Sequence, residues 1–305
     1  MYQKLAFLLI FCAAAWGEEL PLLGLAHVGI RVQDLQSARG FYHDIVGLDE
    51  AFTTKKPDGS VSSITFKVND RQFIRIIPGL TSADVTPMSY IAFRTDRIGK
   101  LRKMLMKLGL SPTAVAKDPE DGTLAFMLPN PPGQMLSSLK FVQYTPGSLQ
   151  TKSKGAALSD RRMSQRLEHA GIVTTDLLPA KEFYVKVLGF RETWSRTNSG
   201  RIVLIHLRAP SPSGDYVELV NQTGIKDLKR ERAGEAAHFS LEVPDAKSAY
   251  EEGLRRSKDV RRQAPRFGMD ERWQTNLFDP DGTRVEFMQP RDPSKKTPVP
   301  PAVVP

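Results

Sequence analysis

The stretch LAHVGIRVQDLQSARGFYHDIVGL at residues 25–48 recurs, without a gap, as LEHAGIVTTDLLPAKEFYVKVLGF at residues 167–190. The identical pairs all lie 142 residues apart, and they include positions that commonly shape strands, helix starts and helix ends: His27, Gly29, Asp34, Phe41, Tyr42 and Gly47 recur as His169, Gly171, Asp176, Phe183, Tyr184 and Gly189. A repeat of this length is one folding unit used twice, so it predicts the architecture before any single element is assigned.

A second repeat lies inside each half, so the chain is predicted to hold four modules. The seven-residue step from His169 to Asp176 recurs from His238 to the aspartate of HFSLEVPD, and the modules begin near residues 25, 88, 167 and 236. An alternating stretch predicts a strand, an aspartate then caps a helix that ends at Gly47 or Gly189, and three strand-like runs follow. The predicted class is α+β, with four β-α-β-β-β modules paired into two domains whose cupped mixed sheets would bind a ligand on the concave face.

The 305 residues allow two domains, since a domain averages roughly 150 residues. The repeat and the changes in composition predict an N-terminal domain at 24–145, a polar and basic linker at 146–166 and a C-terminal domain at 167–290. Residues 291–305 are rich in proline, which predicts an extended tail.

Residues 1–17 are typical of a signal peptide. Lys4 precedes an apolar run of about 12 residues, and Ala15 and Gly17 are small residues at the positions that a signal peptidase needs. The run is shorter than the roughly 20 residues of a membrane-spanning helix. We therefore expect an exported protein, periplasmic or extracellular, without stable insertion into a membrane.

The balance of charges is basic, with 43 Lys and Arg against 34 Asp and Glu, and would suit nucleic acid, an anionic surface or an acidic small substrate. The positive residues do not gather with aromatic ones in a nucleic-acid-binding module, so no nucleic-acid partner is expected. The chain lacks a GxxxxGK loop, a GxSxG elbow and paired cysteines. This excludes phosphate-loop proteins, Ser-His-Asp hydrolases and zinc ribbons. A small-molecule substrate remains as the expected partner, with a homodimer as the candidate assembly.

Several phrases in a fixed order resemble the vicinal oxygen chelate superfamily, which includes glyoxalase I, extradiol dioxygenases and bleomycin-resistance proteins. They are the opening H-x-G-I-x-V-x-D, the FY-x-x-V-L-G-F that follows it, and the closing FDPDG-T-R-V-E-F, set in paired modules. The resemblance covers residues 25–289. It implies a tandem glyoxalase/dioxygenase-like fold with a site in the cup of a sheet.

The resemblance also implies a metal site in the second half of the chain. Four strand residues stand at the positions that hold the metal ion in the family: His169, Glu218, His238 and Glu286. Imidazole nitrogens and carboxylate oxygens suit one divalent ion, which would be Zn, Ni, Mn, Co or Fe(II). Strand alternation places Glu218 on the cup side of DYVELV.

The first half of the chain has a matching residue at only one of these four positions. Comparing the two halves therefore shows which of them could bind a metal ion. Its His27 matches the first histidine, but Arg75, Tyr90 and Lys140 (Ser137 if no gap is allowed) occupy the other three positions. Cations in place of carboxylates would repel a metal ion, so we expect the N-terminal site to be degenerate. A packing or hydrogen-bonding role is expected for His27.

The implied ligands are compatible with more than one reaction. Two His and two Glu resemble glyoxalase I, in which adjacent substrate oxygens chelate the metal ion and a carboxylate, here Glu286 or Glu218, takes a proton next to a carbonyl. The subset His169, His238 and Glu286 resembles the Fe(II) site of extradiol dioxygenases, although the His and Tyr of their signature are missing here. We predict a metal-dependent lyase or isomerase of glyoxalase type; the alternatives are a ring-cleaving dioxygenase and a non-catalytic small-molecule binding protein.

Other polar residues could complete the site. His206 in IVLIHLRA could replace the missing acid/base histidine, but a histidine in an apolar strand is more often a core or edge residue. An anionic end of a substrate could be held by arginines of the second half: Arg201, Arg208, Arg266 and Arg272.

Overall fold

The computed structural model describes residues 18–129, 131–133, 137–225 and 228–291. The predicted signal peptide at 1–17 and residues 292–305 of the predicted tail lie outside the described residues, so both assignments stay predictions. Within the described ranges, no helix is long and apolar enough to cross a membrane.

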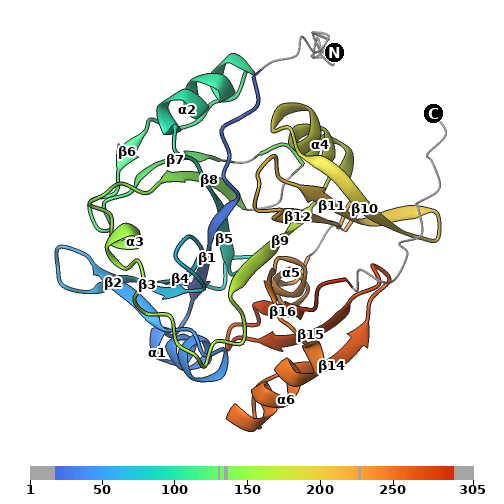
Figure 1. Ribbon diagram of the computed structural model, residues 1–305. Coiled ribbons are helices and arrows are strands. Elements are labelled where there is room, and N and C mark those ends of the chain that lie inside the picture. The colour runs from blue at the N-terminus through green and yellow to red at the C-terminus, as the bar shows by residue number, and fades with distance from the viewer. Residues whose placement is uncertain (1–17, 130, 134–136, 226–227, 292–305) are drawn as a thin grey trace.

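The first half of the chain forms one eight-stranded mixed sheet with the order β2-β3-β4-β1-β5-β8-β7-β6 (Figure 1). Its strands are β1 (Leu25–Val32), β2 (Glu50–Lys55), β3 (Val61–Lys67), β4 (Phe73–Pro78), β5 (Met88–Arg94), β6 (Ala116–Lys117), β7 (Leu124–Leu128) and β8 (Ser138–Gln143). The helical segments are α1 (Leu35–Gly40), the π-helical turn η1 (Phe41–Ile45) and α2 (Ile98–Lys107).

The second half repeats this arrangement with the order β10-β11-β12-β9-β13-β16-β15-β14. Its strands are β9 (Arg166–Thr174), β10 (Arg191–Asn198), β11 (Arg201–Arg208), β12 (Tyr216–Asn221), β13 (Phe239–Glu242), β14 (Arg262–Phe267), β15 (Trp273–Phe278) and β16 (Arg284–Met288). The helical segments are α4 (Leu177–Glu182), η2 (Phe183–Val187) and α6 (Ala246–Arg256), while α3 (Leu149–Lys152) and α5 (Arg230–Ala236) lie between modules. The predicted class, four β-α-β-β-β modules paired into two mixed sheets, is confirmed.

The first helix of each half begins at the predicted aspartate, but only one of the two aspartates makes the capping bond. The Oδ1 atom of Asp34 accepts a hydrogen bond of 2.6 Å from the N–H of Ser37. Asp176 has the same position before α4 and makes no such bond. The residue three positions after Asp176 is Pro179, which has no N–H to donate.

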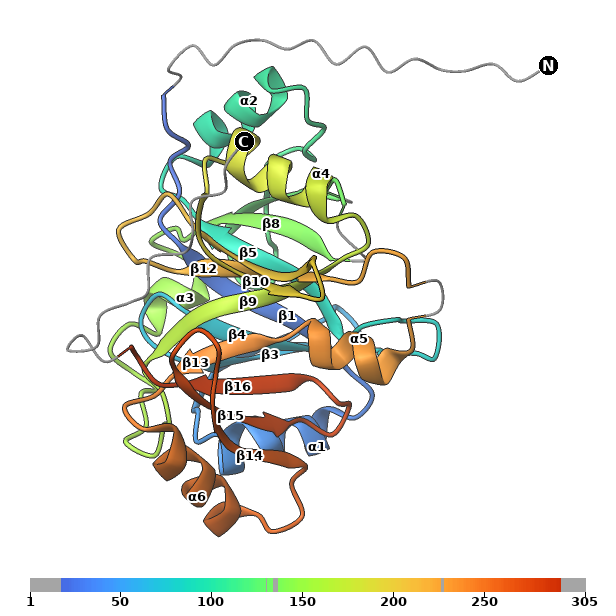
Figure 2. The same ribbon diagram turned by 90° about the vertical axis from the view of Figure 1, so that its right-hand side faces the viewer.

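The first module of the first half packs against the last module of the second half. The helical segment α1–η1 lies beside α6 (Figure 2). The hydroxyl of Tyr42 donates a buried hydrogen bond of 3.0 Å to Oδ2 of Asp279, in the turn between β15 and β16. The guanidinium of Arg256 on α6 donates to the carbonyl of Ile45 at 2.8 Å. These contacts set the orientation of the second sheet, which carries the predicted site.

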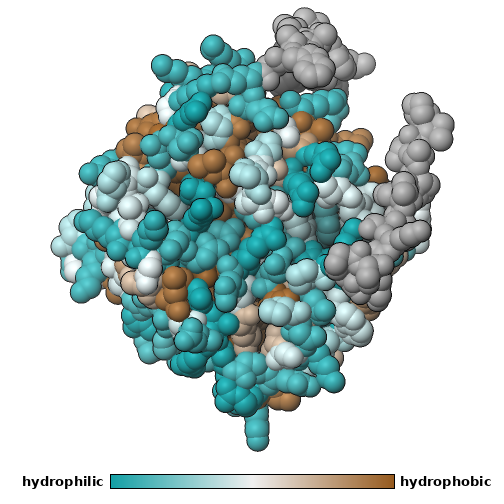
Figure 3. Space-filling view, in the orientation of Figure 1, coloured by the Kyte–Doolittle hydropathy of each residue, from teal (hydrophilic) through white to brown (hydrophobic). Residues whose placement is uncertain are grey.

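The surface is largely hydrophilic on the face shown in Figure 3. Large hydrophobic side chains that are exposed in the described part of the chain occur at few positions: Met106, Leu108, Leu178, Phe267, Met269 and Trp273. The last three lie in or beside the β14–β15 hairpin, where Phe267 and Trp273 make an edge-to-face contact with ring centroids 5.6 Å apart. An apolar group therefore stands at one side of the C-terminal sheet.

Candidate metal centre

The register of three neighbouring strands brings residues that are far apart in sequence to one point. Ser240 of β13 pairs with His169 of β9 on one side and with Glu286 of β16 on the other. His238 stands just before β13, and its main chain exchanges hydrogen bonds with Gly171 of β9. The side chains of His169, His238 and Glu286 are all buried and converge on one face of the sheet.

The spacing of these three side chains matches that of ligands around one metal ion. The Nε2 atom of His169 lies 3.1 Å from Nε2 of His238 and 3.2 Å from Oε2 of Glu286, and the last two atoms are 3.8 Å apart. Two ligands bound at about 2.0–2.1 Å in a tetrahedral site are about 3.3 Å apart. The buried Oε2 of Glu286 has no hydrogen-bond partner among the described residues. The donor set therefore fits a divalent cation.

Gly171 explains why the repeated motif reads H-x-G. A Cβ atom at Gly171 would lie 2.1 Å from two ring atoms of His238, because the imidazole crosses directly over the glycine. The first half repeats this contact, since a Cβ at Gly29 would lie 2.3 Å from the ring of Tyr90. The glycine thus makes room for the side chain that begins the neighbouring module.

The environment of His238 leaves its Nε2 atom available to a metal ion. Its Nδ1 atom lies 2.9 Å from the carbonyl oxygen of Ala236, which can accept an N–H bond from this nitrogen. A guanidinium nitrogen of Arg284 lies 2.7 Å from the same Nδ1. Burial and the positive charge of Arg284 lower the pKa of His238 to about 3, so the imidazole is neutral at pH 7.

His169 has the opposite protonation behaviour. Burial by itself lowers the pKa of this imidazole, but the carboxylates of Glu168 and Glu286 outweigh burial and raise the pKa to about 9. Glu168 is itself held by Arg272 at 2.7 Å. Without a metal ion, His169 therefore carries a proton at neutral pH.

Glu218 lies beside the three-residue cluster and faces the cup side of β12, as its strand parity predicts. Its Oε2 atom is 2.9 Å from Nε2 of His206, and its Oε1 atom is 3.6 Å from Nε2 of His238. Burial opposes ionisation of this carboxylate, but the hydrogen bond from His206 and the nearby imidazoles hold its pKa well below the usual range. Glu218 is thus a charged acceptor next to the cluster.

His206 is buried, yet it belongs to the wall of a cavity and not to the hydrophobic core. It stands directly opposite Glu218 in the β11–β12 ladder, and its ring centroid lies 4.6 Å from that of Trp194 and 4.7 Å from that of Tyr216. Strand alternation could have indicated its orientation. The partner that it faces depends on the register between β11 and β12.

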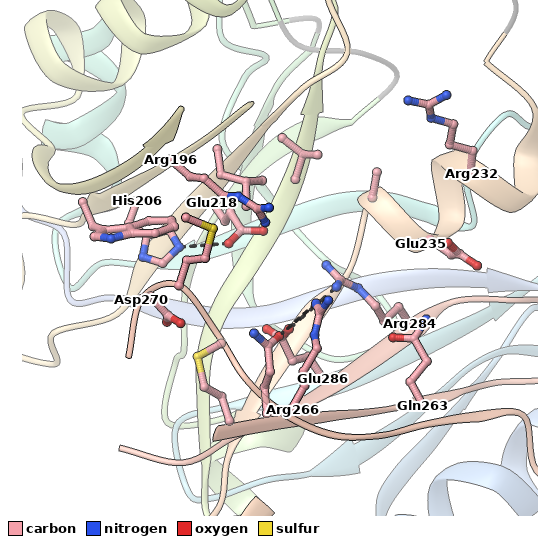
Figure 4. A pocket seen from close by; sticks show the side chains of 17 residues that line it. Arg196, His206, Glu218, Arg232, Glu235, Gln263, Arg266, Asp270, Arg284 and Glu286 are labelled. Atoms are coloured by element: carbon pink, nitrogen blue, oxygen red, sulfur yellow. Dashed lines mark hydrogen bonds and ion pairs between the residues drawn. The ribbon is translucent and has the colours of Figure 1, made fainter. Parts of the chain in front are cut away.

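A cavity of about 360 Å³ opens beside the cluster and is lined by Glu286 together with Glu218 and His206, but by neither His169 nor His238 (Figure 4). Its volume suits a small organic molecule. Both apolar and charged residues line it: Trp194, Arg196, Leu204, His206, Glu218, Val220, Arg232, Glu235, Ala236, Gln263, Arg266, Met269, Asp270, Gln274, Arg284, Glu286 and Met288.

Of the four arginines expected to hold a substrate, only Arg266 lines this cavity. Arg208 and Arg272 line a second cavity of about 350 Å³, which shares Trp194 and His206 with the first. Arg201 donates instead to the carbonyl of Thr223 and lies outside both cavities. The other arginines of the first cavity were missed in the sequence analysis: Arg196, Arg232 and Arg284.

The first half has an ion-pair network where the second half has its cluster. Arg75 pairs with Gly29 in the β4–β1 ladder, as Glu218 does with Gly171, and its guanidinium lies 3.0 Å from Asp121. Elsewhere in the described chain, no three His, Cys, Asp or Glu side chains converge closely enough to bind a metal ion.

The expected role of His27 as a hydrogen-bonding residue is confirmed, since its Nε2 lies 3.3 Å from the hydroxyl of Tyr90. The ammonium group of Lys140, in turn, lies 5.2 Å from the centre of the Tyr90 ring.

Solved structures with a similar fold include ring-cleaving dioxygenases. A single-residue variant of homoprotocatechuate 2,3-dioxygenase from Brevibacterium fuscum is 20% identical, with a TM-score of 0.66 over 92% of this chain and 76% of that one. The anaerobic complex of that enzyme with 3,4-dihydroxyphenylacetate is 19% identical, with a TM-score of 0.63 over 90% and 84% of the two chains. At these identities the likeness concerns the fold. No curated protein sequence gives a significant match.

A family model matches the chain twice, at residues 24–137 and 166–287, which together make up most of its length. The two matches coincide with the two sheets and confirm the resemblance that the repeated motifs indicated. The chain belongs to the Glyoxalase/Bleomycin resistance protein/Dioxygenase superfamily.

Proposed function

We propose that the chain is a metal-dependent enzyme that moves a proton on a small substrate with two adjacent oxygens, in the manner of glyoxalase I. The observation that carries this proposal is the position of Glu218 in the cavity wall beside His169, His238 and Glu286. One oxygen of Glu218 is bound by His206, and the other faces His238. A charged carboxylate stands where an adjacent substrate could give up a proton.

The residues that would hold the metal ion are His169, His238 and Glu286, with Glu218 as the fourth ligand. When bound, the ion would act as a Lewis acid toward the substrate oxygens. Zn, Ni, Mn, Co and Fe(II) all accept this donor set. The chain itself would supply the base, because Glu218 and Glu286 are ionised at neutral pH. The imidazole of His206 contacts Oε2 of Glu218 and can hold this side chain in place whether its carboxyl group is ionised or protonated.

Metal affinity should depend on pH, because His169 must lose its proton before Nε2 can bind an ion. The pKa of about 9 in the metal-free protein means that binding below pH 9 displaces one proton from this residue. Between pH 7 and pH 9, affinity for Ni²⁺ should rise roughly tenfold per pH unit and then level off. Titration calorimetry across this range measures it. In Glu168→Gln, which loses one carboxylate that raises the pKa of His169, the rise should occur at lower pH; equal wild-type affinity at pH 7 and pH 8.5 would count against the assignment.

A second candidate, a ring-cleaving Fe(II) dioxygenase, is favoured by one specific feature. The ligand atoms of His169, His238 and Glu286 all lie within 4.8 Å of one another, and Glu218 is not part of this tight group. Two histidines and one carboxylate with open positions are the donor set of many non-haem iron oxygenases. In this function His206 would supply the imidazole that the sequence lacks between His238 and Glu286.

The variant Glu218→Gln separates the two candidates. If Glu218 is a ligand and base, this change should weaken metal binding by about 10- to 100-fold, as loss of a site partner does elsewhere. Competition with a chelating dye measures the affinity. The control is Glu235→Gln, which removes a carboxylate of the same cavity wall that pairs with Arg261 on its outer side. Wild-type oxygen uptake with catechol by the Fe(II)-loaded Glu218→Gln protein would refute the proton-transfer proposal in favour of the dioxygenase.

A further inference from the structure

The cavity wall holds an equal number of arginines and carboxylates, but among its described residues only Arg284 and Glu286 lie close enough to form an ion pair with each other. The arginines are Arg196, Arg232, Arg266 and Arg284, and the carboxylates are Glu218, Glu235, Asp270 and Glu286. Two of the carboxylates bind side chains that are not arginines of the wall, and a third, Glu286, belongs to the metal-binding cluster. In the part of the chain that the structure describes, the arginines other than Arg284 form no ion pair, so they remain free to attract an anion.

The balance of the carboxylates follows from their contacts. Glu235 pairs with Arg261, which does not line the cavity, and Glu218 is bound by His206. Glu286 lies 3.7 Å from the guanidinium of Arg284, and burial raises the pKa of Asp270. A divalent ion bound at the cluster would make the cavity more positive still. None of these carboxylates forms an ion pair with the other three arginines of the wall in the described part of the chain.

Arg196 is the clearest of these unpaired arginines. It lies on β10, on the same face as Trp194, and its guanidinium makes no hydrogen bond or ion pair with any residue that the structure describes. Its Nε atom is buried without an acceptor. A buried donor without a partner is destabilising, so the folded protein keeps Arg196 here at an energetic cost that an anionic ligand would offset.

Two more arginines face the same space with little to bind. The only hydrogen bond of Arg266 in the described part of the chain is a long one, 3.4 Å, to Oε1 of Gln274. Arg232 on α5 makes none there and stands across the cavity from Arg196 and Glu218 in Figure 4. The wall also carries apolar side chains beside the two glutamines Gln263 and Gln274: Trp194, Leu204, Val220, Met269 and Met288.

We infer that this cavity takes a small organic anion with an apolar body, whose carboxylate binds Arg196 while its two adjacent oxygens face the metal-binding cluster at Glu286. The inference rests on the proposed function, because it assumes a metal ion at the cluster, and it names the class of substrate on which that function acts. Arg266 and Arg232 lie on other walls and contribute longer-range attraction. The inference makes Arg196 a specificity-determining residue.

The test compares two probes that carry the same chelating head and differ in one carboxylate, 3,4-dihydroxyphenylacetate and 4-methylcatechol. Both are titrated into the Zn²⁺-loaded protein, in which the metal ion is redox-inert. We expect the carboxylate probe to bind about 10- to 100-fold more tightly, as one charge-assisted hydrogen bond allows. In Arg196→Gln most of this preference should be lost while 4-methylcatechol keeps its affinity. Arg201→Gln, which alters an exposed arginine of the neighbouring strand outside the cavity, should keep the preference.

The possible results separate the inference from the proposed function. Equal binding of both probes to the wild type, or a preference that survives undiminished in Arg196→Gln, overturns the inference and leaves the proposed function standing. If Zn²⁺ fails to bind, or neither probe binds the Zn²⁺ protein, the proposed function fails. Phenylacetate, which has no chelating head, is then titrated into the metal-free protein. Binding that is lost in Arg196→Gln supports the anion site, and no binding to the wild type overturns it.

Discussion

Replacing His169 with alanine should abolish stoichiometric metal binding, whereas the same change at His27, its counterpart in the first half, should leave the metal content unchanged. His169 supplies the Nε2 atom closest to both other members of the cluster, at 3.1 Å from His238 and 3.2 Å from Glu286. Its loss should reduce affinity by more than the 10- to 100-fold that loss of a supporting residue costs. His27 faces Tyr90 and has no such neighbours.

Elemental analysis of the purified proteins after dialysis against Zn²⁺ or Fe(II) measures this effect. Both histidines are buried on the first strand of a half, so the pair also controls for the packing loss that accompanies truncation. A His169→Ala protein that keeps one equivalent of metal would exclude the cluster as the metal site. A wild-type protein that binds no metal but still binds small molecules would leave only the non-catalytic binding function.

A methyl group at Gly171 should disrupt the metal site without removing any ligand. In Gly171→Ala the new Cβ would lie 2.1 Å from the His238 ring, so the imidazole must move away from His169 and Glu286. We expect a loss of metal affinity of at least 10-fold together with about 1–3 kcal/mol of destabilisation, the usual range for overpacking. The cost in affinity arises because metal sites tolerate little displacement of a ligand.

Gly29→Ala is the matched control, because its Cβ would meet the ring of Tyr90 at 2.3 Å in the same strand context. It should lower the free energy of unfolding by a similar amount and leave metal affinity unchanged. Urea unfolding and metal titration of the two variants separate the effects. If both glycine variants lost metal affinity equally, general destabilisation and not the position of His238 would be the cause.

The degenerate half also contributes to the construction of the site. Arg75 and Asp121 form a buried ion pair where a metal ligand would stand, so the first sheet keeps its shape without an ion. The contact of Tyr42 with Asp279 then positions the turn that leads into β16 and Glu286. A packed first half thus supports the strand that carries one member of the cluster.

The repeated motif was sufficient to predict the modules and the α+β class, whereas the set His169, Glu218, His238 and Glu286 came from the resemblance to the family, and three of these four form the tight cluster. The positions of the motif are those that local geometry constrains most: the glycine under a ring, the aspartate before a helix and the glycine after it. The side of β12 on which Glu218 lies could also be predicted, because side chains alternate along any strand. The half that lacks the cluster could be identified from residue types alone, since Arg75 and Lys140 replace carboxylates.

Tertiary structure decided which other side chains share the cavity. His206 faces Glu218 only because the β11–β12 ladder places them opposite each other. The register between these two strands could not be predicted from the sequence, because it depends on the conformation of the loop that joins them. Arg196 lies on an edge strand and Arg232 on a short helix between modules, and neither belongs to the repeat. Arg272, expected near a substrate, forms a buried ion pair with Glu168 behind His169. The composition of a cavity depends on contacts between distant elements, and local sequence patterns carry little information about such contacts.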